Sequence, residues 1–422
     1  MQASKTLETI RGLKGAFELK ALPGLQSLKR LDFAAAAAAM KGKRLQARTR
    51  TPIGIDVGSR VVKAVQFGRD RWGDGRWQVV AATQIPRSEV AQRANGSAPA
   101  GGPASAQGPA ASKPLTADEV GRLAGTLERQ GFTGSDVVLA VPTDKLSTSV
   151  LDLPPRASQA PLEQIARMEL ARAHKAAPDS FEMGCWDLPA AARATKATPV
   201  MAVACSHADA NAIIDPFESE RFRVCALDVR PAAIARACAA LVGDPGTLTA
   251  ILDVGWTAAS LSLMHQGVVI YGRTLGDGGV CKLYQTLANR LGLEEDVIDY
   301  LLGETGVGDA GPEGAADKRR APVDAAGLIA AHFEAAVQEL QVSLTYAQHQ
   351  YHETAVSRLL LVGGGAGIRG VAAHLSKALG VETRTAAPAD TAVPAEAVTG
   401  VCGSPALTLA MGLAQHPEGP WR

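Results

Sequence analysis

Aromatic side chains are scarce in this chain of 422 residues: they make up 4% of the sequence, although 46% of the residues are hydrophobic. The core must therefore be built mainly from alanine and aliphatic side chains. Cysteine is scarce as well. The six cysteines are scattered and form no CxxC pair, which excludes a disulfide framework and a structural zinc site of the usual spacing, and favours a reducing cytoplasm.

Long apolar runs are also missing. The longest candidate, 33–40, is mostly alanine and falls well short of the roughly 18 residues that a membrane-spanning helix needs. A signal peptide would place its apolar stretch much nearer the start of the chain. We therefore interpret this run as a helix or a tether rather than a membrane anchor.

The net charge of +1 hides an uneven distribution. Residues 1–50 carry 11 Lys and Arg against 3 Asp and Glu, whereas the rest of the chain carries 32 against 39. A protein that binds nucleic acid over its whole surface is therefore excluded. The basic 1–50 extension, expected to be partly disordered, can instead meet anionic lipid or an acidic partner, and a basic tail without a partner is the alternative.

The remaining chain divides into two lobes and an inserted unit. The first lobe spans 51–142 and is interrupted at 91–115 by a flexible insert rich in alanine, glycine, proline and serine. A small α+β unit follows at 143–228. The second lobe spans 229–422 and carries another polar, glycine-rich insert at 303–322. The mixture of strands and helices indicates the α/β class.

Apolar periodicity and turn residues define the individual elements. Strands are predicted at 53–57, 61–67, 77–85, 136–141, 181–187, 199–205, 223–228, 248–254, 259–264, 268–275 and 359–362. Helices are predicted at 116–130, 161–174, 231–241, 282–291, 293–302, 323–352 and 371–379. The first helix opens with a capping box, Thr116-Ala-Asp-Glu119.

One pattern occurs twice, 197 residues apart: an apolar strand that ends in Asp-x-Gly, followed by two further strands. The copies are Asp56-Val-Gly58-Ser59 and Asp253-Val-Gly255-Trp-Thr257. Glycine lets backbone N–H groups approach a phosphate because no Cβ intervenes. An aspartate at a strand end can hold Mg²⁺ through water. The repeat predicts two similar lobes whose hairpins face each other, while either copy alone is also compatible with an ordinary hairpin.

A third glycine loop, Gly363-Gly364-Gly365-Ala-Gly367-Ile-Arg-Gly370, follows a predicted strand and opens a helix. Its second half matches GxGxxG, the dinucleotide fingerprint, so a nicotinamide-dependent oxidoreductase is one reading. That reading needs an acidic residue about 20 positions further on, and Glu382 lies only 12 positions past Gly370. The loop can instead cover the adenosine of a nucleotide held by the two hairpins. Close packing of the helix on the strand is the structural alternative.

Together, these motifs resemble the PilM family of type IV pilus assembly proteins, actin-like proteins related to the division protein FtsA. The first phosphate loop of that family resembles Gly54-Ile-Asp56-Val-Gly58-Ser59-Arg-Val-Val-Lys63, and its second resembles Asp253-Val-Gly255-Trp-Thr257. The adenosine loop resembles Val362-Gly-Gly-Gly365-Ala-Gly-Ile-Arg-Gly370. The resemblance covers about 51–415 and leaves residues 1–50 without a counterpart.

The resemblance implies a two-lobed actin-like fold, a duplicated ribonuclease H-like architecture, with a small inserted α+β subdomain. It also implies a cleft for ATP and Mg²⁺. Asp56 and Asp253 would be the catalytic residues and would hold Mg²⁺ through water. The nucleotide would be bound by Gly58, Ser59, Lys63, Gly255, Thr257, Gly363, Gly364 and Gly365.

The same resemblance implies a partner and a location. The family works in the cytoplasm at the inner face of the inner membrane and docks the short cytoplasmic tail of a bitopic membrane protein, PilN. The groove for that tail involves the inserted subdomain. Peripheral membrane association would come through this partner or through the basic extension, and nucleic acid is not an implied partner.

Several residues depart from the family pattern. Trp256 stands close to the phosphate position, where relatives carry a small residue. Ile298 and Leu301 replace the Glu and Lys of a helix that contacts the nucleoside, and neither side chain can form hydrogen bonds. We therefore expect weakened ATP binding and, at most, a weak ATPase whose fold serves as a docking platform. An FtsA-like division ATPase is the other alternative, although the residues after Ala414 form no amphipathic helix.

Overall fold

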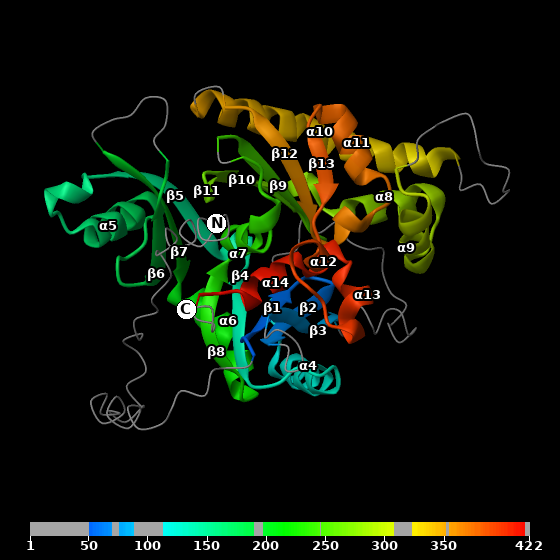
Figure 1. The fold of residues 1–422 in the computed structure, drawn as a ribbon, viewed down its shortest axis with the longest axis horizontal. Helices are drawn as coiled ribbons and strands as arrows, with labels where there is room; N and C mark the ends of the chain where they lie inside the picture. The colour runs from blue at the N-terminus through cyan, green and yellow to red at the C-terminus, as the bar shows by residue number, and fades with distance from the viewer. Residues whose placement is uncertain are drawn as a thin grey trace.

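The structure is a computed structural model that describes residues 50–69, 76–87, 113–189, 197–244, 246–307, 323–351 and 354–417. Two five-stranded sheets and one three-stranded sheet organise these residues (Figure 1). The predictions for the basic extension, for the apolar run 33–40 and for most of both inserts lie outside the described residues.

The first sheet forms the core of the first lobe. In spatial order its strands are β3 (Trp77–Pro86), β2 (Val61–Arg69), β1 (Ile53–Val57), β4 (Asp136–Val141) and β8 (Arg223–Val229). The first three strands are antiparallel neighbours, whereas β1, β4 and β8 run parallel. Two helices, α4 (Ala117–Arg129) and α6 (His207–Ser219), pack on the sheet through a shared hydrophobic cluster. The predicted capping box at Thr116 and Glu119 is confirmed.

The second sheet repeats this topology. Its strands in spatial order are β11 (Val268–Leu275), β10 (Ala259–His265), β9 (Leu248–Val254), β12 (Val356–Val362) and β13 (Glu382–Thr385). Again three antiparallel strands are followed by two parallel ones. The helices of this lobe are α8 (Val280–Leu291), α9 (Glu295–Glu304), α10 (Val323–Gln350) and α11 (Val371–Leu379). The duplication predicted from the two Asp-x-Gly copies is therefore present.

The inserted unit is a separate antiparallel sheet with one helix. Its strands, in the order β5 (Leu146–Leu153), β7 (Thr198–Ser206) and β6 (Phe181–Asp187), pack against α5 (Leu162–His174). This unit projects from the rest of the molecule at the left of Figure 1. The sequence had predicted neither β5 nor α6, because the alternating side chains of β5 are mostly polar and Pro216 interrupts the pattern of α6.

Two predicted boundaries differ from the structure. The inserted unit was expected to end at residue 228, but β8 pairs with β4 in the first sheet, so α6 and β8 belong to the first lobe. The second lobe was expected to run to residue 422. Instead, α12 (Pro388–Thr391), α13 (Thr399–Cys402) and α14 (Thr408–Ala414) follow the second sheet, and α13 and α14 pack against β2 and β3. In both cases the segment joins the lobe against which it buries its apolar side chains, rather than the lobe that is adjacent in the sequence.

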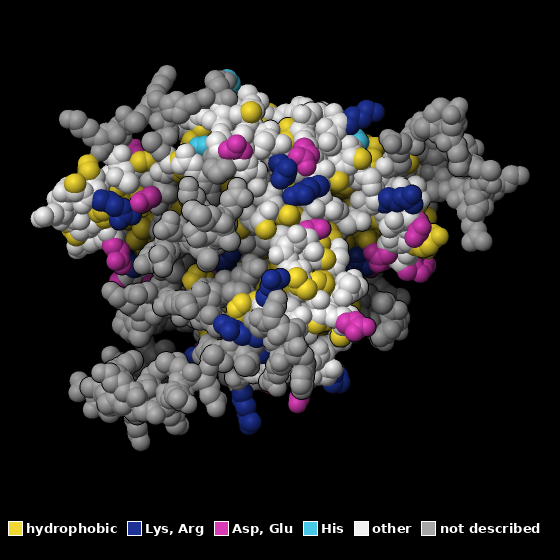
Figure 2. Space-filling model, viewed as in Figure 1, with side chains coloured by type: hydrophobic (Ala, Val, Ile, Leu, Met, Phe, Trp, Pro, Cys, Tyr) yellow, Lys and Arg dark blue, Asp and Glu magenta, His cyan; other side chains and the backbone are white. Residues whose placement is uncertain are grey.

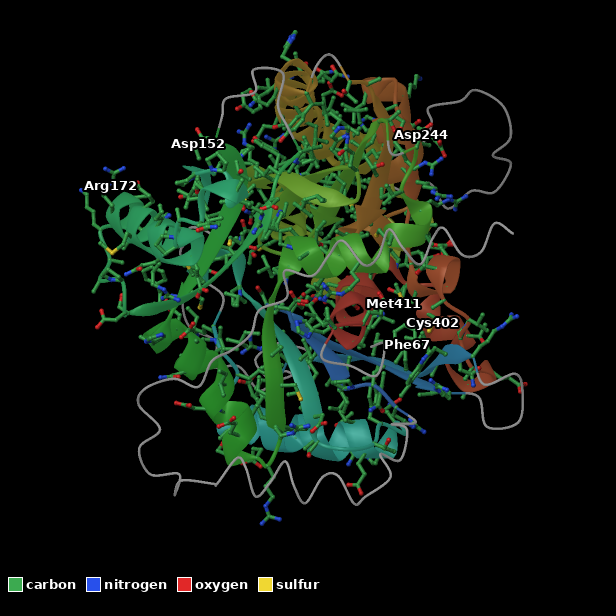
Figure 3. The ribbon with its side chains drawn as sticks, turned by 60° about the vertical axis from the view of Figure 1, so that its left-hand side comes forward. Phe67, Asp152, Arg172, Asp244, Cys402 and Met411 are labelled. Atoms are coloured by element: carbon green, nitrogen blue, oxygen red, sulfur yellow. The ribbon has the colours of Figure 1, made fainter. Side chains whose placement is uncertain are left out.

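Helix α7 (Arg230–Ala237) and α14 connect the two lobes. One hydrophobic cluster contains residues of both helices and of strands in both large sheets: Val138, Ala226, Ala233, Ile234, Ile251, Leu360, Leu409 and Leu413. In Figure 1 the red C-terminal helices lie between the sheets. On the first-lobe side, Met411 of α14 and Cys402 of α13 lie near Phe67 of β2, as labelled in Figure 3.

Short 3₁₀ helices complete the architecture, at Thr143–Lys145, Arg156–Ser158, Ala239–Leu241, Gly276–Gly278, Gly364–Gly367, Glu396–Val398 and Pro405–Leu407. Within the described ranges, no single helix is long and apolar enough to cross a membrane. The segments Glu396–Cys402 and Pro405–Ala414 reach the necessary length and apolar composition only when they are taken together, and they are bent by 97° relative to each other. Every residue of α14 is buried inside the protein.

Glycines let the two connecting helices approach their neighbours closely. A Cβ on Gly412 of α14 would lie 1.9 Å from the carbonyl oxygen of Ala233 in α7, and one on Gly54 of β1 would lie 2.1 Å from that of Ala410. Arg236 of α7 also donates two hydrogen bonds, of 3.1 and 2.9 Å, to the carbonyl oxygen of Gly412. The backbone of α14 is therefore held between β1 and α7.

We expect Gly412→Ala to lower the free energy of unfolding by roughly 3 kcal/mol or more, because the added methyl group would meet backbone atoms on a helix that cannot retreat. Urea unfolding followed by circular dichroism measures the change. The control is Gly327→Ala on the exposed face of α10, where a Cβ would meet nothing within 4 Å. Alanine there should be neutral or stabilise by up to about 1 kcal/mol. Equal stability of the two variants would contradict the close approach.

Candidate functional site

A cleft of about 700 Å³ lies between the two lobes. Both Asp-x-Gly hairpins and the third glycine loop line it, so the structure brings together every residue that the sequence predicted for the site. These residues are Asp56, Gly58, Ser59, Lys63, Asp253, Gly255, Thr257, Gly363, Gly364 and Gly365. Their convergence follows from the duplicated topology, which places the ends of β1 and β9 at the same cleft.

The two hairpins share one backbone geometry. The N–H of Gly58 donates to the carbonyl oxygen of Val61 at 3.1 Å, and the N–H of Gly255 donates to that of Ala258 at the same distance. A Cβ on either glycine would lie within 2.7 Å of that carbonyl oxygen. Glycine is therefore required at both turns, and the sequence repeat reflects a repeated tight turn.

The third glycine loop has two kinds of glycine. Gly363 has a φ of +85°, and a Cβ there would lie 2.3 Å from Oδ1 of Asp253, while one on Gly365 would lie 2.4 Å from Cγ1 of Val254. Close packing on the second hairpin thus accounts for these two positions. In contrast, Gly364 and Gly367 face open space in the cleft. Within the GxGxxG match, packing accounts for Gly365 and for Gly370, whose φ is +80° and whose Cβ would lie 2.3 Å from the carbonyl oxygen of Val307, while Gly367 is left facing the cleft.

Arg230, the first residue of α7, connects the two predicted aspartates. Its Nη1 donates to Oδ1 of Asp56 at 3.0 Å and its Nη2 to Oδ2 of Asp253 at 2.8 Å. Lys63 Nζ donates to the other oxygen of Asp56 at 2.9 Å. Sequence reasoning missed Arg230, because a lone arginine after a predicted strand carries no pattern that separates it from a surface residue.

Charge and burial act against each other at Asp56. Burial alone raises the pKa of its carboxyl group, but the attraction of Lys63 and Arg230 outweighs burial and lowers the pKa below its ordinary value of 3.8. Asp56 is therefore ionised at neutral pH. Its contribution to stability is complete above about pH 4 and is lost as the pH falls through the lowered pKa. For Arg230, burial lowers the pKa and the two aspartates raise it by more, so the guanidinium stays charged.

The sequence predicted that Asp56 and Asp253 hold Mg²⁺ through water, but a magnesium ion between these two carboxyl groups does not fit this arrangement. Three of the four carboxylate oxygens already accept hydrogen bonds from Arg230 or Lys63, and the guanidinium occupies the space between the two carboxyl groups. The fourth oxygen, Oδ1 of Asp253, lies against the backbone at Gly363. Across the described part of the chain, no group of three or more His, Cys, Asp or Glu residues is arranged to hold a metal ion.

The mouth of the cleft is crossed by Arg60, which follows Ser59 in the first hairpin. Its guanidinium forms ion pairs with Asp299 at 3.0 Å and Glu295 at 2.7 Å, both on α9 of the second lobe. It also lies over the rings of Trp256, 4.8 Å from the centroid, and Tyr284, 5.2 Å from the centroid. Trp256 and Tyr284 contact each other edge to face. The bulky ring of Trp256 thus lines the cleft, and the guanidinium of Arg60 packs on its face.

The two α9 residues that the sequence placed beside a nucleoside lie elsewhere. Ile298 and Leu301 are buried in the core of the second lobe, 1% and 7% exposed, and do not line the cleft. The polar group of α9 that does line the cleft is Asp299, and it already accepts hydrogen bonds from Arg60 and from the hydroxyl of Tyr284. Burial and the Asp299 carboxylate raise the pKa of Tyr284, so this hydroxyl keeps its proton.

A duplicated pair of sheets, joined by two helices around a cleft with paired Asp-x-Gly hairpins, defines the actin-like class of proteins. A family model described as "Type IV pilus assembly protein PilM" matches residues 118–416, more than two thirds of the chain. The chain therefore belongs to the PilM family of type IV pilus assembly proteins.

A solved structure supports this fold, and two others share a weaker similarity. A structure of a PilM-PilN type IV pilus biogenesis complex matches with a TM-score of 0.65 and 18% identity over 86% of this chain and 98% of that chain. The ethanolamine utilization protein EutJ from Carboxydothermus hydrogenoformans matches with a TM-score of 0.47 and 12% identity, over 87% and 89%. MreB 5 of Spiroplasma citri bound to AMPPNP reaches 0.45 and 11%, over 88% and 97%. The last two are too distant to support a statement about this chain.

We expect Arg60→Ala to loosen the mouth of the cleft, because the ion pairs to Asp299 and Glu295 join the two lobes there. Hydrogen exchange measured by mass spectrometry should show faster deuterium uptake in 295–304. The control is Arg223→Ala, which breaks an exposed ion pair with Asp136 inside the first sheet. Unchanged uptake in α9 of Arg60→Ala, or the same increase in both variants, would contradict a contact that closes the cleft.

Proposed function

We propose that this protein is an adaptor of the type IV pilus assembly machine that docks the cytoplasmic tail of a bitopic inner-membrane protein. Family membership over 118–416 carries the proposal. The similar fold that was solved in a PilM-PilN complex supports the choice of partner, a PilN-like protein. In this role the chain works in the cytoplasm at the inner face of the inner membrane, and it reaches the membrane through the partner or through its basic 1–50 extension.

The inserted unit offers a surface for such a tail. A shallow, open depression at the start of α5 is lined by Pro161, Leu162, Glu163, Gln164 and Arg167. Met168 lies one turn beyond Gln164 on the same helix face and is 56% exposed. An exposed methionine beside this depression suits an apolar side chain of a peptide, because its flexible thioether adapts to different partners. Figure 2 shows further hydrophobic side chains on this unit, at the left.

Nucleotide is the second ligand in the proposal. Lys63, Arg230 and the open Gly364 and Gly367 give the cleft cations and unobstructed backbone for a phosphate chain. Turnover is slow in this proposal for a physical reason. An attacking water must be oriented by a group with a free acceptor, but three of the four carboxylate oxygens of Asp56 and Asp253 accept hydrogen bonds from Arg230 or Lys63, and the fourth lies against the backbone at Gly363. ATP then acts as a bound effector rather than as a substrate that is rapidly consumed.

The docking surface predicts a specific loss of binding. In calorimetric titration with a synthetic peptide of the partner's cytoplasmic tail, Met168→Glu should weaken binding at least about tenfold, because a carboxylate would have to be desolvated at the apolar contact. The control is Val342→Glu on α10 of the second lobe, where an equally apolar side chain is 64% exposed. Equal affinities of both variants would contradict docking on α5.

For the cleft, we expect ATP to bind with a Kd weaker than about 1 µM and phosphate release to stay at the level of a buffer blank. The physical reasons are the lost nucleoside contacts and the occupied carboxylates. Calorimetry and a coupled phosphate assay measure the two quantities on the full chain. Sub-micromolar affinity together with clear hydrolysis would contradict this weakened role.

A further inference from the structure

Four charged side chains form a closed cluster at the floor of the cleft. Arg230 is paired with Asp56 and Asp253, and Lys63 is paired with Asp56. Two positive and two negative groups balance one another. Such a cluster is stable in a low-dielectric site only because each charge has a partner, and removal of one member leaves a buried charge uncompensated.

The cations of this cluster are more exposed than the carboxylates. The side chains of Arg230 and Lys63 are 23% and 15% exposed, compared with 3% and 10% for Asp56 and Asp253. All four line the cleft. The aspartates thus form the inner layer at the strand ends, and the guanidinium and ammonium groups present positive charge to whatever enters.

A guanidinium carries more N–H donors than the two bonds from Arg230 to the carboxylates use, and its planar fork matches phosphate oxygens. It lies where a metal bridging the two hairpins would have to lie. A divalent cation entering here would be repelled by two resident cations and would find one carboxylate oxygen without a cationic partner.

We propose that Arg230 takes the place of a divalent metal, so that the cleft binds the phosphate chain of a nucleotide in a metal-independent way. This inference rests on the proposed nucleotide binding and adds the mode of binding. Arg230 and Lys63 contact the phosphate oxygens, and the tight turns at Gly58 and Gly255 bring backbone within reach of the same chain.

If Arg230 replaces a metal, then removing its charge should make nucleotide binding depend on a metal. Arg230→Gln removes the central cation and leaves the two carboxylates facing each other, which are the oxygen ligands that Mg²⁺ prefers. The variant should therefore lose metal-independent binding and gain a requirement for Mg²⁺. If Arg230 had only a structural role, this substitution would weaken nucleotide binding equally with and without Mg²⁺.

The test is a titration of the full chain with fluorescent mant-ATP, in EDTA and again in excess MgCl₂. For the unaltered protein the two Kd values should agree within about threefold, and for Arg230→Gln the Kd in EDTA should exceed that in Mg²⁺ by at least about tenfold. Arg230→Lys keeps the charge and should keep the independence from metal with lower affinity. Arg223→Gln, an exposed arginine of the first sheet, is the matched control and should behave as the unaltered protein.

The outcomes separate the two proposals. Binding by the unaltered protein that is at least about tenfold tighter with Mg²⁺ would overturn the metal-independent mode while nucleotide binding stands. Absence of binding in both buffers would overturn the nucleotide part of the function as well, whereas tail docking is decided by the peptide titration. Thermal unfolding checks each variant. If Arg230→Gln does not fold, the comparison of the unaltered protein with Arg230→Lys decides the question.

Discussion

Two carboxylates at the ends of strands from different lobes lie close together because one guanidinium is placed between them. Without Arg230, Asp56 and Asp253 would be two buried negative charges with only Lys63 to offset them. The arginine belongs to α7, one of the two helices that share a hydrophobic cluster with both large sheets. The floor of the cleft is therefore fixed by charge pairing, and the same helix carries the apolar packing that holds the lobes together.

Close backbone contacts make this arrangement sterically possible. Gly54 and Gly412 let α14 lie between β1 and α7, and Gly363 lets the third loop meet the carboxylate of Asp253. In each case a Cβ would overlap atoms of another element, most of them in the backbone, which cannot move aside as a long side chain can. The two connecting helices thus meet each other and β1 through backbone atoms, and the third glycine loop meets the second hairpin equally closely.

The mouth of the cleft is partly filled by side chains that join the two lobes. Arg60 reaches across to α9 and stacks on Trp256 and Tyr284, so aromatic and ionic contacts occupy part of the space at the mouth. Exposed ion pairs of this kind are individually weak, worth roughly 0–1 kcal/mol. A ligand can therefore displace them at modest cost. Such contacts are compatible with the proposed role of a nucleotide as a bound effector.

The sequence by itself determined the duplicated topology, most of the strands and helices, and the convergence of ten predicted residues on one cleft. Local patterns carry this information, because alternation defines strands, caps define helices, and a turn that admits no Cβ demands glycine. Tertiary structure alone decided that α6 and β8 belong to the first lobe, that α14 returns to it, and that Arg230 lies between Asp56 and Asp253. These results depend on apolar surfaces and charges that are distant in the chain, and no local pattern records which of them will meet.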